Sequence, residues 1–153
     1  MGGPQQDIVI TEFTMDDYAV VYVLWQRAGL WMRPSDGPQE TLLKLSRDPR
    51  LFLVARDPEA GVVGTVMGGW DGRRAYVYHL AVLPEHTRRG AGTALMDELE
   101  RRFRDLGAMK AKLQILTDNE VSKAFFAARG YLFETDCEPW GKELATGGAP
   151  PSR

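Results

Sequence analysis

The sequence predicts an α/β (α+β) domain in which a single mixed β-sheet is flanked by helices. Short apolar or alternating runs, typical of strands, are separated by segments with apolar residues at helical spacing. The elements follow the order β-α-α-β-β-β-α-β-α-β, and a short apolar run at the end can add one more strand. The length of 153 residues is the usual size of one domain.

An edge strand and a helix open the predicted domain. Ile8–Phe13 alternates apolar and polar residues, as a half-buried strand does. Thr14 or Asp16 can cap the following helix, because their side-chain oxygens accept hydrogen bonds from free helix amides. The apolar stripe of this helix consists of Tyr18, Val21, Tyr22, Trp25 and Ala28.

A loop, a short helix and a buried strand are expected next. The Pro and Gly content of Arg33–Pro38 indicates the loop. The helix covers Gln39–Arg47 and directs Leu42 and Leu45 inward. The continuous apolar run in Leu51–Arg56 indicates a buried strand.

A β-hairpin forms the centre of the predicted sheet. Asp57–Gly61 turns the preceding strand into a second one, Val62–Trp70. The dipeptide Asp71-Gly72 is a strong signal for a tight hairpin turn. We therefore expect Arg73–Leu83 to pair back on the preceding strand.

A long helix and another strand follow the hairpin. The helix starts after Gly92 and ends at Gly107, a residue type common just beyond helix ends. Its inward residues are Leu95, Leu99, Phe103 and Leu106. Lys110–Leu116 is the expected strand.

The last helix is capped by Asn119 or Asp118 and closed by Gly130. Its expected inward face consists of Val121, Ala124, Phe125 and Ala128. Tyr131–Asp136 predicts a strand, and Trp140–Leu144 can add a final one. Around the domain, residues 8–145, we expect a flexible N-terminus at residues 1–7 and a Gly- and Pro-rich disordered tail at residues 146–153.

The composition excludes several classes of partner. Hydrophobic residues make up 44% and charged residues 26%, and the net charge is −2, so no broad basic surface for nucleic acid or anionic membranes is expected. A secretory signal and a span of roughly 20 apolar residues are both lacking. The single cysteine, Cys137, suits a reducing compartment, and we expect a cytoplasmic protein. Neither His79 nor His86 has partners at ligand spacing, so no metal site is expected.

The junction between Pro84 and Thr93 has the properties of an anion-binding turn. Its two glycines allow a close approach of the backbone, and the first turn of a helix offers unpaired amides. Arg88 and Arg89 are unfavourable beside the positive end of the helix dipole unless an anion lies there. Alternatively, Gly90 only permits a tight turn and both arginines point into solvent. The spacing fits neither a dinucleotide fingerprint nor a P-loop.

The same junction carries a family resemblance. The stretch LAVLPEHTRRGAGTALMDELE resembles the acetyl-CoA signature of the GNAT superfamily of N-acetyltransferases, and DNEVSKAFFAARGY resembles its second landmark. The order of elements is similar from about Ile8 to Leu144. The resemblance implies a mixed, mostly antiparallel sheet of six to seven strands flanked by four helices. It also implies an N-acetyltransferase of the small bacterial branch, with acetyl-CoA as co-substrate.

The resemblance implies a role for each matching residue. Main-chain groups of Leu80, Ala81 and Val82 would pair with the pantetheine arm, and the Val82 N–H would polarise the thioester carbonyl. Asn119 and Phe126 would lie near the arm and the thiol. The amides that would hold the pyrophosphate belong to Arg88, Arg89, Gly90, Ala91, Gly92 and Thr93.

The usual catalytic side chains of the family are missing. Phe126 stands where relatives often carry the tyrosine acid, and Gln114 where some carry a glutamate base. Tyr76, Tyr78 and His79 are the remaining candidate bases, although His79 fits a hydrogen-bonded structural role equally well. Direct attack of a primary amine in a ternary complex needs little beyond orientation. The alternative is a catalytically silent acyl-CoA-binding or sensor protein of the same fold.

The acceptor is expected opposite the cofactor, beneath a lid formed by residues 28–37. The candidate substrate-binding residues are Trp31, Arg33, Asp36, Asp136 and Glu138. An equally good interpretation is a loop anchored by Trp31 with solvated charges. The acceptor is an amine of a small molecule or a peptide, and the protein is a monomer or a homodimer.

Overall fold

The computed structural model describes residues 7–145. The chain divides into two compact units between Gln114 and Ile115, and each unit is described by itself. The expected flexible N-terminus, apart from Asp7, and the expected disordered tail lie outside the described residues. No helix within residues 7–145 is both long and apolar enough to cross a bilayer.

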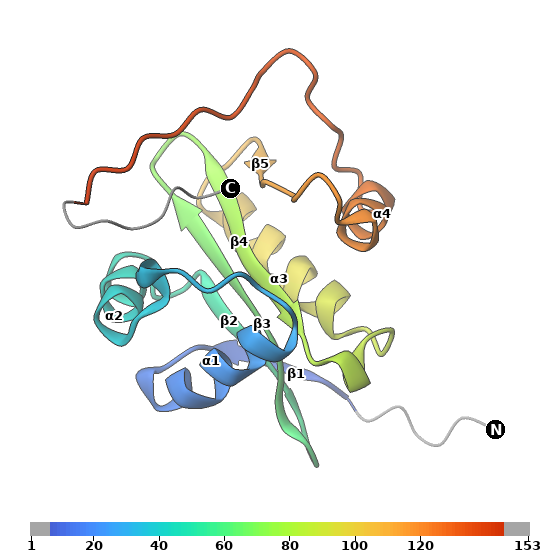
Figure 1. Cartoon of the computed structure of the whole chain (residues 1–153). Coiled ribbons are helices and arrows are strands. Elements are labelled where there is room, and N and C mark those ends of the chain that lie inside the picture. Colours follow the sequence, from blue (N-terminus) through green and yellow to red (C-terminus); the bar gives the residue numbers. More distant parts are fainter. Residues whose placement is uncertain (1–6, 146–153) are drawn as a thin grey trace. The chain divides into compact units, whose positions relative to one another are not determined.

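The first unit contains a sheet in the order β1-β2-β3-β4-β5 (Figure 1). The first three pairings are antiparallel and the last is parallel, so the predicted mixed, mostly antiparallel sheet is confirmed. Within residues 7–145 the sheet has five strands rather than six or seven. The strands are β1 (Val9–Glu12), β2 (Phe52–Asp57), β3 (Gly61–Trp70), β4 (Ala75–Val82) and β5 (Ala111–Lys112).

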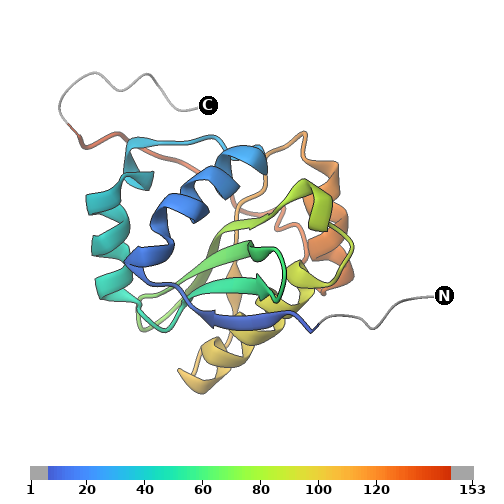
Figure 2. The same ribbon diagram turned by 90° about the horizontal axis from the view of Figure 1, so that it is seen from below.

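Helices cover both faces of this sheet. Helices α1 (Tyr18–Arg27) and α2 (Pro38–Arg47) lie on one face and α3 (Ala91–Asp105) on the other (Figure 2). The fourth helix, α4 (Glu120–Ala128), belongs to the second unit, so the described chain has the four α-helices that were predicted.

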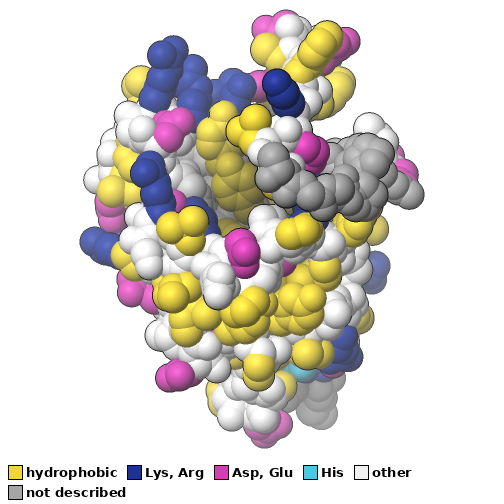
Figure 3. All heavy atoms as spheres, turned by 60° about the vertical axis from the view of Figure 1, so that its left-hand side comes forward, with side chains coloured by type: hydrophobic (Ala, Val, Ile, Leu, Met, Phe, Trp, Pro, Cys, Tyr) yellow, Lys and Arg dark blue, Asp and Glu magenta, His cyan; other side chains and the backbone are white. Residues whose placement is uncertain are grey.

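On the α1 face, Trp25 is fully buried in a core formed by α1, β2, β3 and β4. Phe13 and Phe52 stack with their ring centroids 4.0 Å apart. Before α1, the Thr14 N–H donates to Asp17 Oδ2 at 3.1 Å. The outer side of this face keeps hydrophobic side chains exposed (Figure 3), and these include Val20, Val23, Leu42 and Leu43.

The expectation that Leu42 faces inward is wrong, since 49% of it is exposed. Thr41 is buried instead, and its hydroxyl lies 3.5 Å from the Asp36 carbonyl. Lys44, one turn later, donates to the carbonyl of Gly68 on β3. These two contacts fix the rotation of α2, so Leu42 points away from the sheet.

On the α3 face, the helix approaches β3 closely because β3 carries glycine there. A Cβ atom at Gly68 would lie only 2.6 Å from Leu99 Cδ1 and 2.9 Å from Phe103 Cζ. Leu95, Leu99 and Phe103 are buried as predicted. Leu106 is not, because α3 ends at Asp105 and 48% of Leu106 is exposed.

The predicted hairpin turn is confirmed. Asp71 accepts hydrogen bonds from the amides of Arg73 and Arg74 at 2.7 and 2.6 Å, and its own amide donates to the Arg74 carbonyl. Backbone groups that would be free at the turn are therefore satisfied by one aspartate, which holds the β3–β4 pairing in register.

In the second unit, Asn119 caps α4 by accepting a hydrogen bond from the Ser122 amide at 3.0 Å. The expected inward face is wrong: Val121 is 84% exposed, whereas Phe126 is 5% exposed. The reason is a chain reversal after the helix. The Tyr131 amide bonds the Phe126 carbonyl at 3.0 Å, and the two rings pack 5.3 Å apart.

Neither of the two strands predicted after α4 forms. Within the described part of the second unit, Tyr131–Asp136 and Trp140–Leu144 enter no ladder. Leu132 and Phe133 are 85% and 91% exposed. Alternation of apolar and polar residues becomes a strand only where a partner strand satisfies the backbone. The predicted strand Lys110–Leu116 is likewise reduced to the two residues that pair with β4.

Candidate active site

A β-bulge in β4 shapes the centre of the candidate site. The β3–β4 register shifts between Thr65 and Met67, so His79 and Leu80 together lie opposite one residue of β3. His79 has φ of 50°, which is uncommon for a residue other than glycine. Bulges redirect side chains. As a result, the consecutive residues Tyr78 and His79 line the same pocket.

Beyond its first residues, β4 has an open edge. The β5 ladder covers Ala75 and Tyr76, and within residues 7–145 no strand pairs with the rest of that edge. The Leu83 amide donates to the Val63 carbonyl of β3 at 2.8 Å. Because successive amides of a strand point to opposite sides, the Val82 N–H points away from β3, along the open edge.

The open edge leads into the first turn of α3 through a short 3₁₀ helix, η3 (Pro84–His86). Gly90 precedes α3 with φ of 85°, and a Cβ there would meet no atom within 4 Å. The first bond of the helix runs from the Ala94 amide to the Gly90 carbonyl at 2.9 Å. The three amides from Ala91 to Thr93 consequently have no acceptor within the helix.

Two arginines stand at the same turn. Arg88 and Arg89 are exposed, and Arg88 has φ of 69°. Neither guanidinium forms an ion pair with any residue between 7 and 145. The Thr87 hydroxyl is engaged locally with the Pro84 carbonyl at 2.9 Å. Free amides, a helix dipole and two arginines at one turn favour an anionic ligand.

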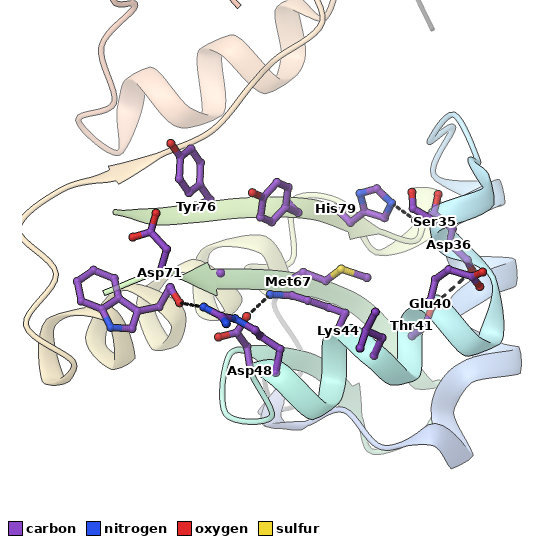
Figure 4. A pocket seen from close by; sticks show the side chains of 15 residues that line it. Ser35, Asp36, Glu40, Thr41, Lys44, Asp48, Met67, Asp71, Tyr76 and His79 are labelled. Atoms are coloured by element: carbon purple, nitrogen blue, oxygen red, sulfur yellow. Dashed lines mark hydrogen bonds and ion pairs between the residues drawn. The ribbon is translucent and has the colours of Figure 1, made fainter. Parts of the chain in front are cut away.

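On the α2 side of β4 lies a pocket of about 820 Å³ (Figure 4). Its walls come from α2, the ends of β3 and β4, and a short 3₁₀ helix, η2 (Pro34–Asp36). The lining residues are Ser35, Asp36, Glu40, Thr41, Leu43, Lys44, Arg47, Asp48, Met67, Gly69, Trp70, Asp71, Tyr76, Tyr78 and His79.

His79 and Asp36 are bonded at one end of this pocket. His79 Nε2 lies 2.7 Å from Asp36 Oδ1, and the Asp36 side chain is 4% exposed (Figure 4). Burial alone would raise the pKa of Asp36, but the hydrogen bonds from His79 and from the Arg33 amide outweigh it and lower that pKa. The Trp25 ring packs edge-to-face against the imidazole at 5.2 Å. The hydrogen-bonded histidine anticipated from the sequence is therefore present.

Tyr76 and Tyr78 form the other side of the pocket, with ring centroids 6.1 Å apart. Burial raises the pKa of Tyr78, so its hydroxyl stays protonated at neutral pH and is a poor base. Lys44 lies 6.0 Å above the Tyr78 ring and donates to Asp48 at 2.6 Å and to the Gly68 carbonyl. Sequence reasoning did not identify Lys44, and no local signal marks it.

The structure contradicts the interpretation of residues 28–37 as a loop anchored by Trp31 with solvated charges, and the lid remains a prediction. Trp31 is 47% exposed and carries the Arg33 guanidinium 5.5 Å above its ring, so it does not anchor the loop in a core. Asp36 is not a solvated charge either, because η2 turns it inward to His79. Asp136 and Glu138 are exposed residues of the second unit.

Two predicted cofactor residues also belong to the second unit. The side-chain oxygen of Asn119 is occupied by its capping bond, and Phe126 is buried against Tyr131. The expectation that Phe126 lies off the buried face of its helix is therefore wrong, while contact of either residue with a cofactor remains a prediction.

The sequence matches a known protein family over most of its length. The profile of the "Acetyltransferase (GNAT) family" matches residues 13–131. Acetyltransferase ECA0875 of Pectobacterium atrosepticum is 39% identical over 134 residues, covering 86% of this chain and 92% of that protein. Acetyltransferase SG1711 of Sodalis glossinidius is 36% identical over 136 residues, covering 88% and 94%.

Solved structures share the fold. Ard1 from Thermoplasma volcanium superposes with a TM-score of 0.76 at 25% identity, covering 84% of each chain. The PaiA N-acetyltransferase from Thermoplasma acidophilum, solved in complex with coenzyme A, has a TM-score of 0.76 at 19% identity, covering 84% of this chain and 91% of that one. Because the identity to the PaiA enzyme is only 19%, this similarity shows a shared fold and nothing further.

Proposed function

Because the chain belongs to the GNAT family of acetyltransferases, we propose that it transfers the acetyl group of acetyl-CoA to a primary amine. The amine, on a small molecule or a peptide, attacks the thioester directly in a ternary complex. The observation that carries this proposal is the open edge of β4, which leads into the free amides of α3. Such an edge accepts an extended ligand and such a helix start accepts its phosphates.

The residues present fit coenzyme A. The main chain of Leu80, Ala81 and Val82 offers hydrogen-bonding groups to the amides of the pantetheine arm, as an added strand would. The turn from Arg88 to Thr93 offers amides and two guanidinium groups to the diphosphate. The Val82 N–H, directed along the open edge, suits a thioester oxygen that gains negative charge in the transition state.

The α2 pocket suits a cationic acceptor. A primary amine is mostly protonated at neutral pH and arrives as a cation. The pocket carries more acidic than basic groups, which favours such a ligand. Its acidic residues are Asp36, Glu40, Asp48 and Asp71, against Lys44 and Arg47.

A second candidate function is an acyl-CoA-binding or sensor protein without catalysis. It is favoured by Gln114 and Phe126, which stand where relatives often carry a base and an acid. A panel of amines assayed for release of free CoA separates the two functions. Turnover above the uncatalysed rate eliminates the sensor, whereas binding of acetyl-CoA without turnover supports it.

Calorimetry with acetyl-CoA tests the cofactor site. A Gly90→Glu, Gly92→Glu variant should abolish binding, because two carboxylates replace the space and charge that a diphosphate requires. Gly107→Glu is the matched control, since Gly107 has φ of 90° and open space at the opposite end of the same helix. It brings a carboxylate and the same left-handed strain, about 1–2 kcal/mol, and should bind normally. Equal binding by both variants would refute the assignment.

A further inference from the structure

We infer that Asp36 and His79 form a catalytic dyad, in which His79 Nδ1 accepts the proton of the substrate ammonium group and Asp36 positions the ring. This inference rests on the proposed acetyl transfer. It also replaces the substrate-contacting role that the sequence suggested for Asp36, because a buried carboxylate already bonded to His79 is not available to a ligand.

The hydrogen bond defines the protonation of the imidazole. An ionised carboxylate only accepts hydrogen bonds, so at neutral pH the Nε2 nitrogen that faces Asp36 carries a hydrogen. A neutral imidazole then has a free lone pair on Nδ1. Within residues 7–145 no group hydrogen-bonds that nitrogen, and the ring lines the pocket with 26% of its surface exposed. His79 is thus prepared to accept a proton rather than donate one.

Asp36 is held firmly enough to orient the ring. Its Oδ2 accepts the Arg33 amide at 2.9 Å. Its carbonyl accepts the Tyr18 hydroxyl at 2.8 Å and lies 3.5 Å from the Thr41 hydroxyl. Contacts from Arg33 before η2, from α1 and from α2 therefore fix the side chain and the carbonyl of Asp36. This is the arrangement in which a buried carboxylate fixes a histidine tautomer and stabilises the imidazolium that forms.

The other titratable groups of the pocket are less suitable as bases. Burial raises the pKa of Tyr78, which keeps its hydroxyl protonated. Asp48 is paired with Lys44. Charged and titratable groups of the surrounding elements line the pocket or interact with Tyr18 and Asp36. They are Tyr18 and Tyr22 on α1, Arg33 before η2, Glu40, Lys44 and Arg47 on α2, Asp48 just after α2, Asp71 after β3, and Tyr76 and Tyr78 on β4.

In the proposed acetyl transfer, every proton and electron pair has an acceptor. His79 Nδ1 takes one proton from the ammonium group, which frees the nitrogen lone pair. The nitrogen attacks the thioester carbon, a C–N bond forms, and the C–S bond breaks with its electron pair staying on sulfur. The CoA thiolate takes the second proton from nitrogen, and His79 releases its proton to water.

The test compares His79→Gln with wild type, using the best amine of the panel. Glutamine can still donate to Asp36 but cannot accept the proton at neutral pH. We expect kcat to fall by about 10²–10⁴-fold, the KM for acetyl-CoA to stay unchanged, and the dependence of kcat on pH to flatten. Asp105→Asn, at the last residue of α3 and with a side chain that is 62% exposed, is the control and should keep the wild-type rate and pH profile.

Asp36→Asn tests the positioning role. It should lower kcat by about tenfold or more, because the imidazolium that forms during the reaction loses its carboxylate neighbour. Nitrogen-15 spectra of the His79 ring give a readout independent of turnover, with hydrogen on Nε2 in wild type and a shift toward Nδ1–H in Asp36→Asn. Acetyl-CoA calorimetry and thermal unfolding verify that each variant is folded.

Turnover by wild type tests the acetyl transfer, and the rate and pH profile of His79→Gln test the dyad. If wild type releases CoA with an amine and His79→Gln does so at the same rate with the same pH profile, the dyad is refuted and the acetyltransferase stands. Wild-type spectra with hydrogen on Nδ1 would also refute the dyad. If wild type releases no CoA with any amine of the panel, the proposed function fails and the dyad fails with it.

Discussion

At the scale of single residues, Asp36 shows how a buried charge becomes tolerable. Its side chain is 4% exposed, and removal from water disfavours a carboxylate unless hydrogen bonds replace the lost hydration. The bonds from His79 and the Arg33 amide do so, and they hold the pKa of Asp36 below its ordinary value of 3.8. The native state therefore binds this proton less readily than the unfolded chain.

Asp36→Asn should destabilise the protein at neutral pH by about 1–3 kcal/mol, because an amide cannot accept both hydrogen bonds as strongly as a carboxylate. A carboxyl with a lowered native pKa contributes stability above its unfolded value and loses it as the pH falls through the native value. The difference in the free energy of unfolding between wild type and Asp36→Asn should therefore shrink below about pH 4. Urea unfolding at pH 7 and pH 3 measures it, and a constant difference would contradict the assignment.

At the scale of elements, Glu98 and Arg102 of α3 form a hydrogen-bond network that connects this helix to β1 at the edge of the sheet. Glu98 accepts from Arg101 and Arg102, and Arg102 also donates to Glu12 on β1 at 2.7 Å and to the Arg50 carbonyl at 2.8 Å. The hydrogen bonds from Arg101 and Arg102 lower the pKa of Glu98 to about 2. Glu98 thus holds Arg102 in the position from which it reaches β1 and the start of β2.

Glu98→Gln should lower the free energy of unfolding at pH 7 by about 1 kcal/mol, allowing for solvent screening of a side chain that is 25% exposed. The contribution of ionised Glu98 to the free energy of unfolding is fully present above pH 4.5, the ordinary pKa of glutamate. It is lost as the pH falls through about 2, the pKa of Glu98 in the folded protein. Glu120→Gln is the control, because Glu120 is 79% exposed in its i,i+3 pair with Lys123. Denaturant unfolding should show almost no change for it, and equal losses in both variants would argue against the network.

At the scale of the whole chain, local signals predicted what depends on neighbours in sequence. The Asp71-Gly72 turn, the Asn119 cap and the Leu95, Leu99, Phe103 stripe all follow from short-range patterns. The Asp36–His79 bond joins residues 43 apart and depends on a bulge whose left-handed residue is a histidine, so no spacing rule predicts it.

The errors have the same physical origin. Leu42 faces outward because the contact of Thr41 with the Asp36 carbonyl and the hydrogen bond of Lys44 to the Gly68 carbonyl of β3 fix the rotation of α2. Phe126 is buried because the chain reverses after α4. Both helices are about ten residues long, and in such short helices contacts with the flanking segments and the sheet outweigh the periodic pattern. The turn at Arg88–Thr93, which we propose as the diphosphate site, could be predicted because its glycines and arginines are contiguous in the sequence.

Because helices cover both faces of the sheet, two adjacent glycines of β3 face different surroundings. Gly68 faces α3 and Gly69 faces the pocket. A Cβ at Gly68 would lie 2.6 Å from Leu99 Cδ1 and 3.1 Å from Leu51 Cβ, inside the packed α3 face. A Cβ at Gly69 would lie on the pocket side, in ordinary contact with Lys44 Nζ at 3.5 Å and 3.2 Å from Tyr78 Cε2, whose ring borders the open pocket and can shift slightly. Gly68→Ala should therefore destabilise the protein by about 1–3 kcal/mol through overpacking, and Gly69→Ala by much less. Thermal unfolding of the two variants measures the contrast, and a larger loss for Gly69→Ala would mean that α3 does not pack on β3 as closely as the structure indicates.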